Sequence, residues 1–211
     1  MEIDRNAEFI NHLGGHLRTG SLTTKFWFTN SDQADCDKIL QKNGLSRGNY
    51  ICVFPGSGFR AKHWGTDNWL KFFEGFFCGY PLTKVVLLGG PRDKKVNDAI
   101  FARLRSRNQV IDLTGSLNLR VLAKVIAHSK LLVSTDTAAI HIAAAVGTPN
   151  VCIMGGGHFG RFYPYGDLSK NRIVHKQMDC YGCNWRCRYS SIKCIQDIDC
   201  EDVLKEVQKI L

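Results

Sequence analysis

The chain has 211 residues, 44% of them hydrophobic, and it carries a formal net charge of +9. This length and composition suffice for one substantial core, and they exclude a disordered, fibrous or collagen-like chain. The uncharged apolar runs are too short to span a membrane, and the N-terminus lacks a signal-peptide pattern. We therefore expect a soluble, cytoplasmic protein.

Residues 1–48 predict a connecting segment without a core of its own. A weak helical pattern covers residues 2–13, a short strand is expected over 25–28, and a helix capped by Ser31 is expected to run to Asn43. This segment carries six basic and six acidic side chains, so the excess positive charge lies in residues 49–211. That distribution favours an anionic ligand or surface there, and nucleotides, nucleic acid and anionic membranes all qualify.

A regular alternation of elements begins at residue 49. Strands are expected over 50–54, 84–88, 110–113, 131–133 and 150–154, and helices over 66–77, 93–105, 119–128 and 136–146. Apolar strands that alternate with helices predict right-handed βαβ crossovers in a parallel sheet. The sequence therefore predicts an α/β fold with a Rossmann-like, doubly wound sheet.

Each glycine-rich or polar cluster of this region follows a predicted strand. The clusters are Pro55–Gly58, Gly89–Pro91, Thr114–Ser116, Ser134–Asp136 and Gly155–Gly157. Doubly wound sheets bind ligands at the carboxyl edge of their strands, so this placement is typical of a nucleotide site. Short turns between strand and helix need glycine in any case, so a single cluster has little weight. The combination favours a ligand site.

The segment from Ser134 to His141 brings a carboxylate, hydroxyls and an imidazole to a strand-to-helix junction. A helix start has unpaired N–H groups and a partial positive charge, which suit the phosphates of a nucleotide. Two simpler interpretations stand beside this one. Asp136 could be an ordinary helix cap, and His141 could be a buried histidine with one hydrogen bond.

The loop after the first regular strand has the outline of a phosphate cradle. Gly56-Ser57-Gly58 leaves backbone N–H groups open, and Lys62 follows closely. The loop matches neither the Walker motif nor the dinucleotide fingerprint, so neither an NTPase nor a simple dehydrogenase is favoured.

These loops together resemble the donor-binding half of glycosyltransferase family nine, the heptosyltransferases of lipopolysaccharide inner-core synthesis. The motifs run from Pro55 to Trp64, from Gly89 to Asp93, and from Ser134 to His141, and the resemblance covers about residues 49–211. It implies the two-lobed GT-B architecture, in which a C-terminal lobe binds a nucleotide sugar, usually ADP-heptose. It also implies an enzyme that transfers the sugar with inversion to a lipopolysaccharide or other glycan acceptor, with no cofactor required.

The resemblance also assigns roles to residues of the donor site. By position, Lys62 would neutralise the donor diphosphate, and Asp93 would lie near the sugar or the ribose. Asp136, Thr137 and the N–H of Ala138 would line the pyrophosphate and the heptose, with His141 one helical turn behind and Ser57 in the glycine turn. The family usually has glycine where this chain has Ala138, and a Gly-x-Thr-x-Pro motif where it has Gly155–Phe159.

The acceptor lobe and general base of that family have no counterpart in the sequence. We expect residues 1–48 to be a linker and the remnant of the acceptor lobe, and residues 49–211 to be the donor-binding domain. We expect the chain to bind a donor but not to catalyse transfer alone. A peripheral contact with the inner membrane surface would fit the same role.

Nine cysteines are present, and five of them fall within residues 180–200. Cys36, Cys52, Cys78 and Cys152 are predicted to be small core residues. Cys180, Cys183, Cys187 and Cys194 could form a four-thiolate structural zinc site, although reduced thiols or occasional disulfides are the preferred interpretation. Family relatives are similar in having clustered cysteines before a final helix, here residues 195–211.

Two alternative functions remain at this stage. Aromatic and basic side chains interleave at Trp185, Arg186, Arg188 and Tyr189, so a zinc-stabilised nucleic-acid-binding module is conceivable, although no nucleic acid is favoured. A nucleotide-sugar epimerase of the same two-lobed architecture is the other alternative. It would require carboxylates placed for proton abstraction, and the sequence does not indicate them.

Overall fold

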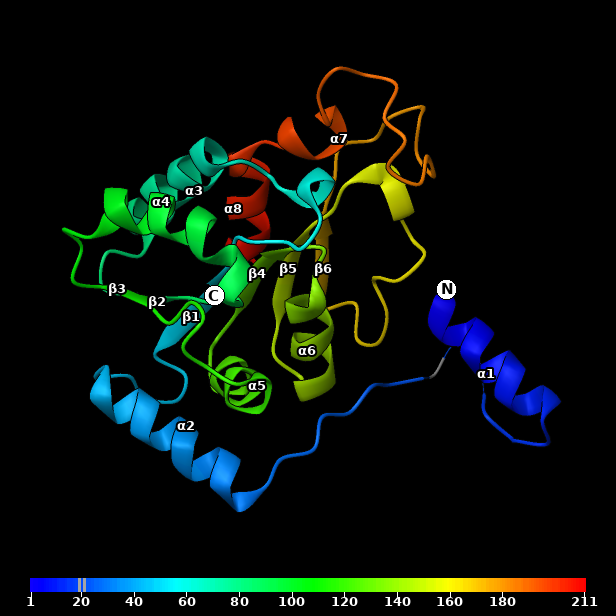
Figure 1. Cartoon of the computed structure of the whole chain (residues 1–211), viewed down its shortest axis with the longest axis horizontal. Coiled ribbons are helices and arrows are strands. Elements are labelled where there is room, and N and C mark those ends of the chain that lie inside the picture. Colours follow the sequence, from blue (N-terminus) through cyan, green and yellow to red (C-terminus); the bar gives the residue numbers. More distant parts are fainter. Residues whose placement is uncertain (19, 21) are drawn as a thin grey trace.

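A six-stranded parallel sheet forms the centre of the computed structural model, which describes residues 1–18, 20 and 22–211 (Figure 1). The strands are β1 (Tyr50–Phe54), β2 (Lys84–Leu87), β3 (Val110–Asp112), β4 (Leu132–Thr135), β5 (Asn150–Ile153) and β6 (Asn171–Val174). Their order in the sheet is β3-β2-β1-β4-β5-β6, and every neighbouring pair is parallel. The predicted Rossmann-like, doubly wound sheet is confirmed.

Helices cover both faces of this sheet. The helices of the described residues are α1 (Glu2–His12), α2 (Asn30–Lys42), α3 (Thr66–Gly79), α4 (Lys94–Leu104), α5 (Leu119–Ala127), α6 (Ala138–Val146), α7 (Lys193–Gln196) and α8 (Cys200–Gln208), and six of them form the two covering layers. Short 3₁₀ helices follow three strands: η1 (Arg60–Lys62), η2 (Pro91–Asp93) and η3 (Gly156–His158). Helices α3, α4 and α8 pack on one face, and α2, α5 and α6 on the other (Figure 1).

The core divides into two clusters because side chains alternate along each strand. In β1, Ile51 and Val53 face the α3 side, whereas Tyr50 and Cys52 face the α5 side. The first cluster is strongly aromatic, with Trp69, Phe72, Phe73, Phe76 and Phe77 of α3 packed at successive ring contacts. This packing joins α3 to the sheet.

The segment before β1 differs from the prediction in two details. The strand expected over 25–28 does not form, because the segment has no strand partner in the described residues. Instead, Phe26 and Phe28 stack on each other and pack against the second cluster. The cap of α2 is Thr29 rather than Ser31, since Thr29 and Asp32 form a reciprocal capping box.

Helix α2 is joined to the sheet domain by its buried face. Cys36 and Leu40 belong to the second core cluster, and α2 packs against α5. Helix α1 lies further out, and the Glu2 N–H donates to the Arg161 carbonyl at 2.7 Å. The boundary between domains at residues 48 and 49 stays a prediction.

The rest of the chain differs from the sequence analysis in three respects. Strand β6 has no predicted counterpart, because its polar beginning and short length lack a strand signal. The final helix expected over 195–211 is divided into α7 and α8, and Asp199 caps the second of them. Cys78 is exposed on α3, whereas Cys36, Cys52 and Cys152 are buried as predicted.

None of the helices in the described part of the chain combines the length and apolar character that a membrane crossing requires.

Candidate functional site

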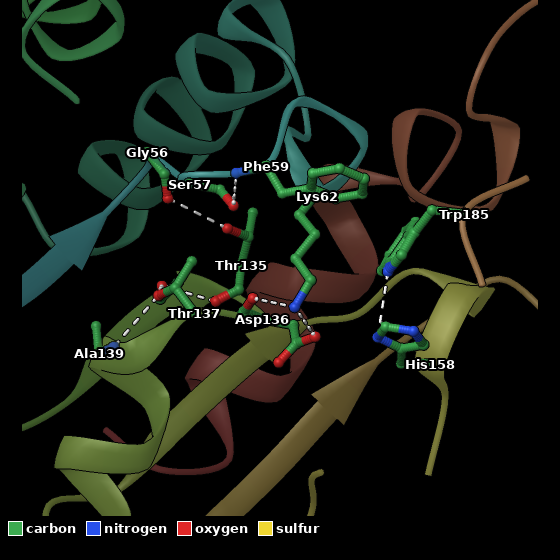
Figure 2. A network of polar contacts seen from close by, with 11 residues as sticks. Gly56, Ser57, Phe59, Lys62, Thr135, Asp136, Thr137, Ala139, His158 and Trp185 are labelled. Carbon is green, nitrogen blue, oxygen red and sulfur yellow. Dashed lines mark hydrogen bonds and ion pairs between the residues drawn. The ribbon is translucent and has the colours of Figure 1, made fainter. Parts of the chain in front are cut away.

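The loops after β1 and β4 meet at the point where the strand order of the sheet reverses. Strand β1 lies between β2 and β4, and the chain crosses from one half of the sheet to the other there. In open parallel sheets this reversal leaves a crevice at the carboxyl edge, which is the usual ligand site. Figure 2 shows the side chains that converge at this crevice.

An ion pair between Lys62 and Asp136 bridges the crevice. The Lys62 Nζ donates to Asp136 Oδ2 at 2.6 Å and to the Asp136 carbonyl oxygen at 3.1 Å, although the residues are 74 positions apart (Figure 2). The two side chains are only 18% and 8% exposed. A poorly solvated ammonium group therefore lies beside the start of α6, as the sequence predicts for a diphosphate site.

Helix α6 begins at Ala138, two residues later than predicted. Thr137 is its cap, and the Thr137 hydroxyl accepts the Ala139 N–H at 3.3 Å while contacting the Ser134 hydroxyl at 3.1 Å. Asp136 is therefore not the helix cap. Its carboxylate is instead available for Lys62, and helix geometry leaves the Ala138 N–H without a partner inside the helix.

His141 lies one turn into α6, is half-buried and has one hydrogen-bond partner among the described residues, the Tyr165 hydroxyl. Its Nδ1 lies 3.2 Å from the Tyr165 hydroxyl, and its ring stacks on the Tyr165 ring at a centroid distance of 5.8 Å. Burial lowers the pKa of the imidazole below its ordinary value of 6.5, against a smaller opposing effect of Asp136. A direct contact of His141 with a donor stays a prediction.

The lowered pKa of His141 predicts a pH dependence of stability. Below about pH 6.5 the unfolded chain binds a proton that the folded chain resists, so the free energy of unfolding decreases as the pH falls. His128, whose pKa is also lowered by burial, adds to this decrease. We expect the free energy of unfolding of His141→Gln, measured in urea, to decline less steeply than that of the parent between pH 7 and pH 5. His12→Gln, a change at an exposed histidine, is the control and should decline as steeply as the parent. An unchanged slope in His141→Gln would contradict the contribution of His141 to the pH dependence.

Ser57 and Asp93 take part in the local structure of their loops. The Ser57 hydroxyl accepts the Phe59 N–H at 3.2 Å. Asp93 is 9% exposed, and its Oδ2 accepts the Gly90 N–H at 2.8 Å. A side chain at Gly56 would collide with the Asp93 carboxylate, so the glycine turn lies directly on it. The Asp93 carboxylate therefore packs against the glycine turn. The roles of Ser57 and Asp93 toward a donor stay predictions.

An aromatic cluster next to Lys62 was not predicted as part of the site. The Trp185 ring centroid lies 5.7 Å from the Lys62 Nζ, and the Trp185 indole N–H donates to His158 Nδ1 at 3.3 Å (Figure 2). Phe59 packs edge-on against Trp185 at 5.8 Å. The glycine run after β5 was the available signal, because it provides the space that a large ring needs.

The cysteine-rich segment gives no support to a zinc site, the alternative that the sequence leaves behind reduced thiols or occasional disulfides. Within residues 1–18, 20 and 22–211, no three His, Cys, Asp or Glu side chains converge closely enough to hold a metal ion. The four cysteines that could have formed such a site, Cys180, Cys183, Cys187 and Cys194, are free thiols. Burial raises the pKa of the Cys194 thiol, which is the behaviour of a structural core cysteine.

Comparison with known proteins extends the likeness to most of the chain. The model of glycosyltransferase family 9 (heptosyltransferase) matches residues 15–193. Lipooligosaccharide heptosyltransferase 2 of Campylobacter jejuni is 24% identical over 175 residues, which are 82% of this chain and 54% of the relative. The chain thus spans about half the length of such curated relatives.

Solved structures share the fold at low sequence identity. A family 9 glycosyltransferase from Veillonella parvula has a TM-score of 0.77 and 21% identity, covering 96% of this chain and 57% of that one. The E. coli ADP-heptose lps heptosyltransferase II has a TM-score of 0.71 and 21% identity, covering 92% and 55%. The predicted Rossmann-like fold of a GT-B lobe is confirmed, and with its family-specific match over residues 15–193 the chain belongs to glycosyltransferase family 9.

Proposed function

We propose that this chain binds the nucleotide-sugar donor of a heptosyltransferase, with ADP-heptose as the donor. The observation that carries the proposal is the Lys62–Asp136 pair in the β1/β4 crevice, beside the first N–H groups of α6. A lysine and a helix N-terminus together suit the charge of a diphosphate. Family membership supports a sugar nucleotide as the source of that diphosphate.

The proposed reaction is transfer of the sugar with inversion. An acceptor hydroxyl attacks the anomeric carbon, the bond from that carbon to the diphosphate oxygen breaks, and its electron pair remains on the nucleoside diphosphate. The Lys62 ammonium and the α6 N-terminus would stabilise the charge that develops on this leaving group. The hydroxyl proton would go to a general base outside this chain. A lipopolysaccharide core is the proposed acceptor.

Neither alternative function has comparable support. A nucleotide-sugar epimerase requires carboxylates free to move a proton, whereas the Asp136 carboxylate in the crevice is paired with Lys62. A zinc-stabilised nucleic-acid-binding module would leave the crevice and the family match without an explanation.

Calorimetric titration with ADP-heptose, a UDP-sugar and a GDP-sugar tests the proposal. We expect saturable binding of ADP-heptose and weaker binding of the other two, because they differ from the proposed donor in the nucleoside and in the sugar. Failure to bind any nucleotide sugar, together with binding of single-stranded nucleic acid at moderate salt, would overturn the proposal. Turnover by the isolated chain with a lipopolysaccharide acceptor would contradict only the proposal that the general base lies outside this chain.

A further inference from the structure

The cysteine-rich segment, residues 180–200, packs on the glycine run Gly155–Gly157 that follows β5. A side chain at Gly156 would collide with the Tyr181 ring, and one at Gly157 would collide with the Trp185 indole. The backbones are joined as well, since the Gly182 N–H donates to the Gly156 carbonyl at 2.9 Å and the Asn184 N–H to the Gly157 carbonyl at 3.1 Å. The segment is therefore fixed against the sheet edge next to the crevice.

Trp185 is held in an unfavourable backbone conformation at this point. Its φ is 63° and that of Asn184 is 49°, and the left-handed region costs a residue other than glycine about 1–2 kcal/mol. The ring is nonetheless fixed by His158 and Phe59 and remains partly exposed. Strain of this kind is retained where the surrounding structure holds a side chain for a purpose, and it is concentrated at ligand sites.

The order of strands indicates which part of a donor would reach Trp185. We assign the ribose to the loop after β2, because the resemblance places Asp93 of that loop near the sugar or the ribose. A diphosphate between Lys62 and α6 would lie over β1 and β4, so the sugar attached to its far end points toward β5. The Trp185 ring lies on the loop after β5 and next to the Lys62 ammonium group.

The Trp185 indole N–H is already bonded to His158, so the ring presents mainly its apolar surface. An indole of this kind suits the C–H face of a sugar, as large aromatic rings combine apolar area with a weakly negative face.

We infer that Trp185 is a specificity-determining residue that packs against the glycosyl group of the nucleotide sugar. The inference rests on the proposed function and deepens it, because it divides donor recognition between two parts of the crevice. Lys62 and α6 would bind the diphosphate, whereas Trp185 would recognise the sugar. ADP, which lacks the sugar, would not contact Trp185.

Calorimetry with two probes, ADP and ADP-heptose, tests this division. Trp185→Leu retains apolar volume over Gly157 and removes the aromatic face. We expect its affinity for ADP-heptose to fall about fivefold to tenfold and its affinity for ADP to change by less than about twofold. Trp185→Phe should recover most of the lost affinity. All three proteins bear the same left-handed backbone cost, so a difference in binding reports on the ring.

Tyr189→Leu is the matched control, because Tyr189 is a partly exposed aromatic residue of the same segment that contacts Arg188 and Lys193. It should bind both probes as the parent does. Equal weakening of ADP and ADP-heptose in Trp185→Leu, or no change in either, would overturn the inference and leave the proposed function intact. If the parent binds neither probe, the proposed function fails and the inference with it. Thermal unfolding of each variant establishes that it is folded.

Discussion

Replacement of Lys62 by methionine is expected to weaken the binding of ADP about 100-fold, because a charge-assisted contact to the diphosphate is lost. The effect is large since the Asp136 carboxylate, 8% exposed, remains in the crevice without its cation and repels the ligand. Calorimetric titration of the parent and the variant measures the loss. Unchanged ADP affinity in a folded Lys62→Met protein would exclude Lys62 as the diphosphate partner.

Two further variants separate binding from folding at this position. Lys62→Arg keeps the positive charge and should retain most of the ADP affinity. Removal of the cation alone also destabilises the fold, by about 2 kcal/mol, because it leaves a poorly solvated carboxylate unpaired. The double variant Lys62→Met with Asp136→Asn should recover this stability and still bind ADP weakly. Such a result would show that the loss of ADP binding does not come from unfolding.

Replacement of Trp64 by alanine is expected to cost about 3–5 kcal/mol of unfolding free energy. Trp64 is completely buried, and its ring packs edge-on against Trp69 at a centroid distance of 5.0 Å. Its indole N–H donates to the Ile198 carbonyl at 2.9 Å, so the variant also leaves that carbonyl without a partner. The residue connects the loop that carries Lys62 to the C-terminal helices.

Urea unfolding measures this cost, and Trp27→Ala is the matched control. Trp27 is 75% exposed, so its removal should change the unfolding free energy by less than about 0.5 kcal/mol. A loss below about 1 kcal/mol in Trp64→Ala would show that the loop is not anchored through this ring.

The sheet could be predicted from the sequence because its central strands are short, apolar and separated by helices of regular length. β1 matches its predicted bounds, and the order of the chain alone places the loops after β1 and β4 at one edge. β6 was missed because Asn171 and Arg172 interrupt the apolar pattern. Pairing with β5 makes this segment a strand, and such pairing cannot be inferred from local composition.

The site could be predicted only as far as local patterns determine it. The sequence places Lys62 and Asp136 at one crevice, but it does not reveal that they pair, nor that Thr137 replaces Asp136 as the helix cap. In the sequence, Trp185 is one of several interleaved aromatic and basic residues, a pattern that is compatible with nucleic-acid binding but does not favour it. Its position depends on contacts with Gly157 and His158, which are about 27 residues away in sequence.

The Lys62–Asp136 pair has a consequence for the end of a catalytic cycle. On the proposed function, a diphosphate and the Asp136 carboxylate would compete for the same ammonium group, which lies 2.6 Å from Asp136 Oδ2. The departing nucleoside diphosphate would therefore be replaced by an anion that belongs to the protein. Product release is often the slow step of an enzyme. Here the Asp136 carboxylate would help to displace the product and would restore the ion pair with Lys62.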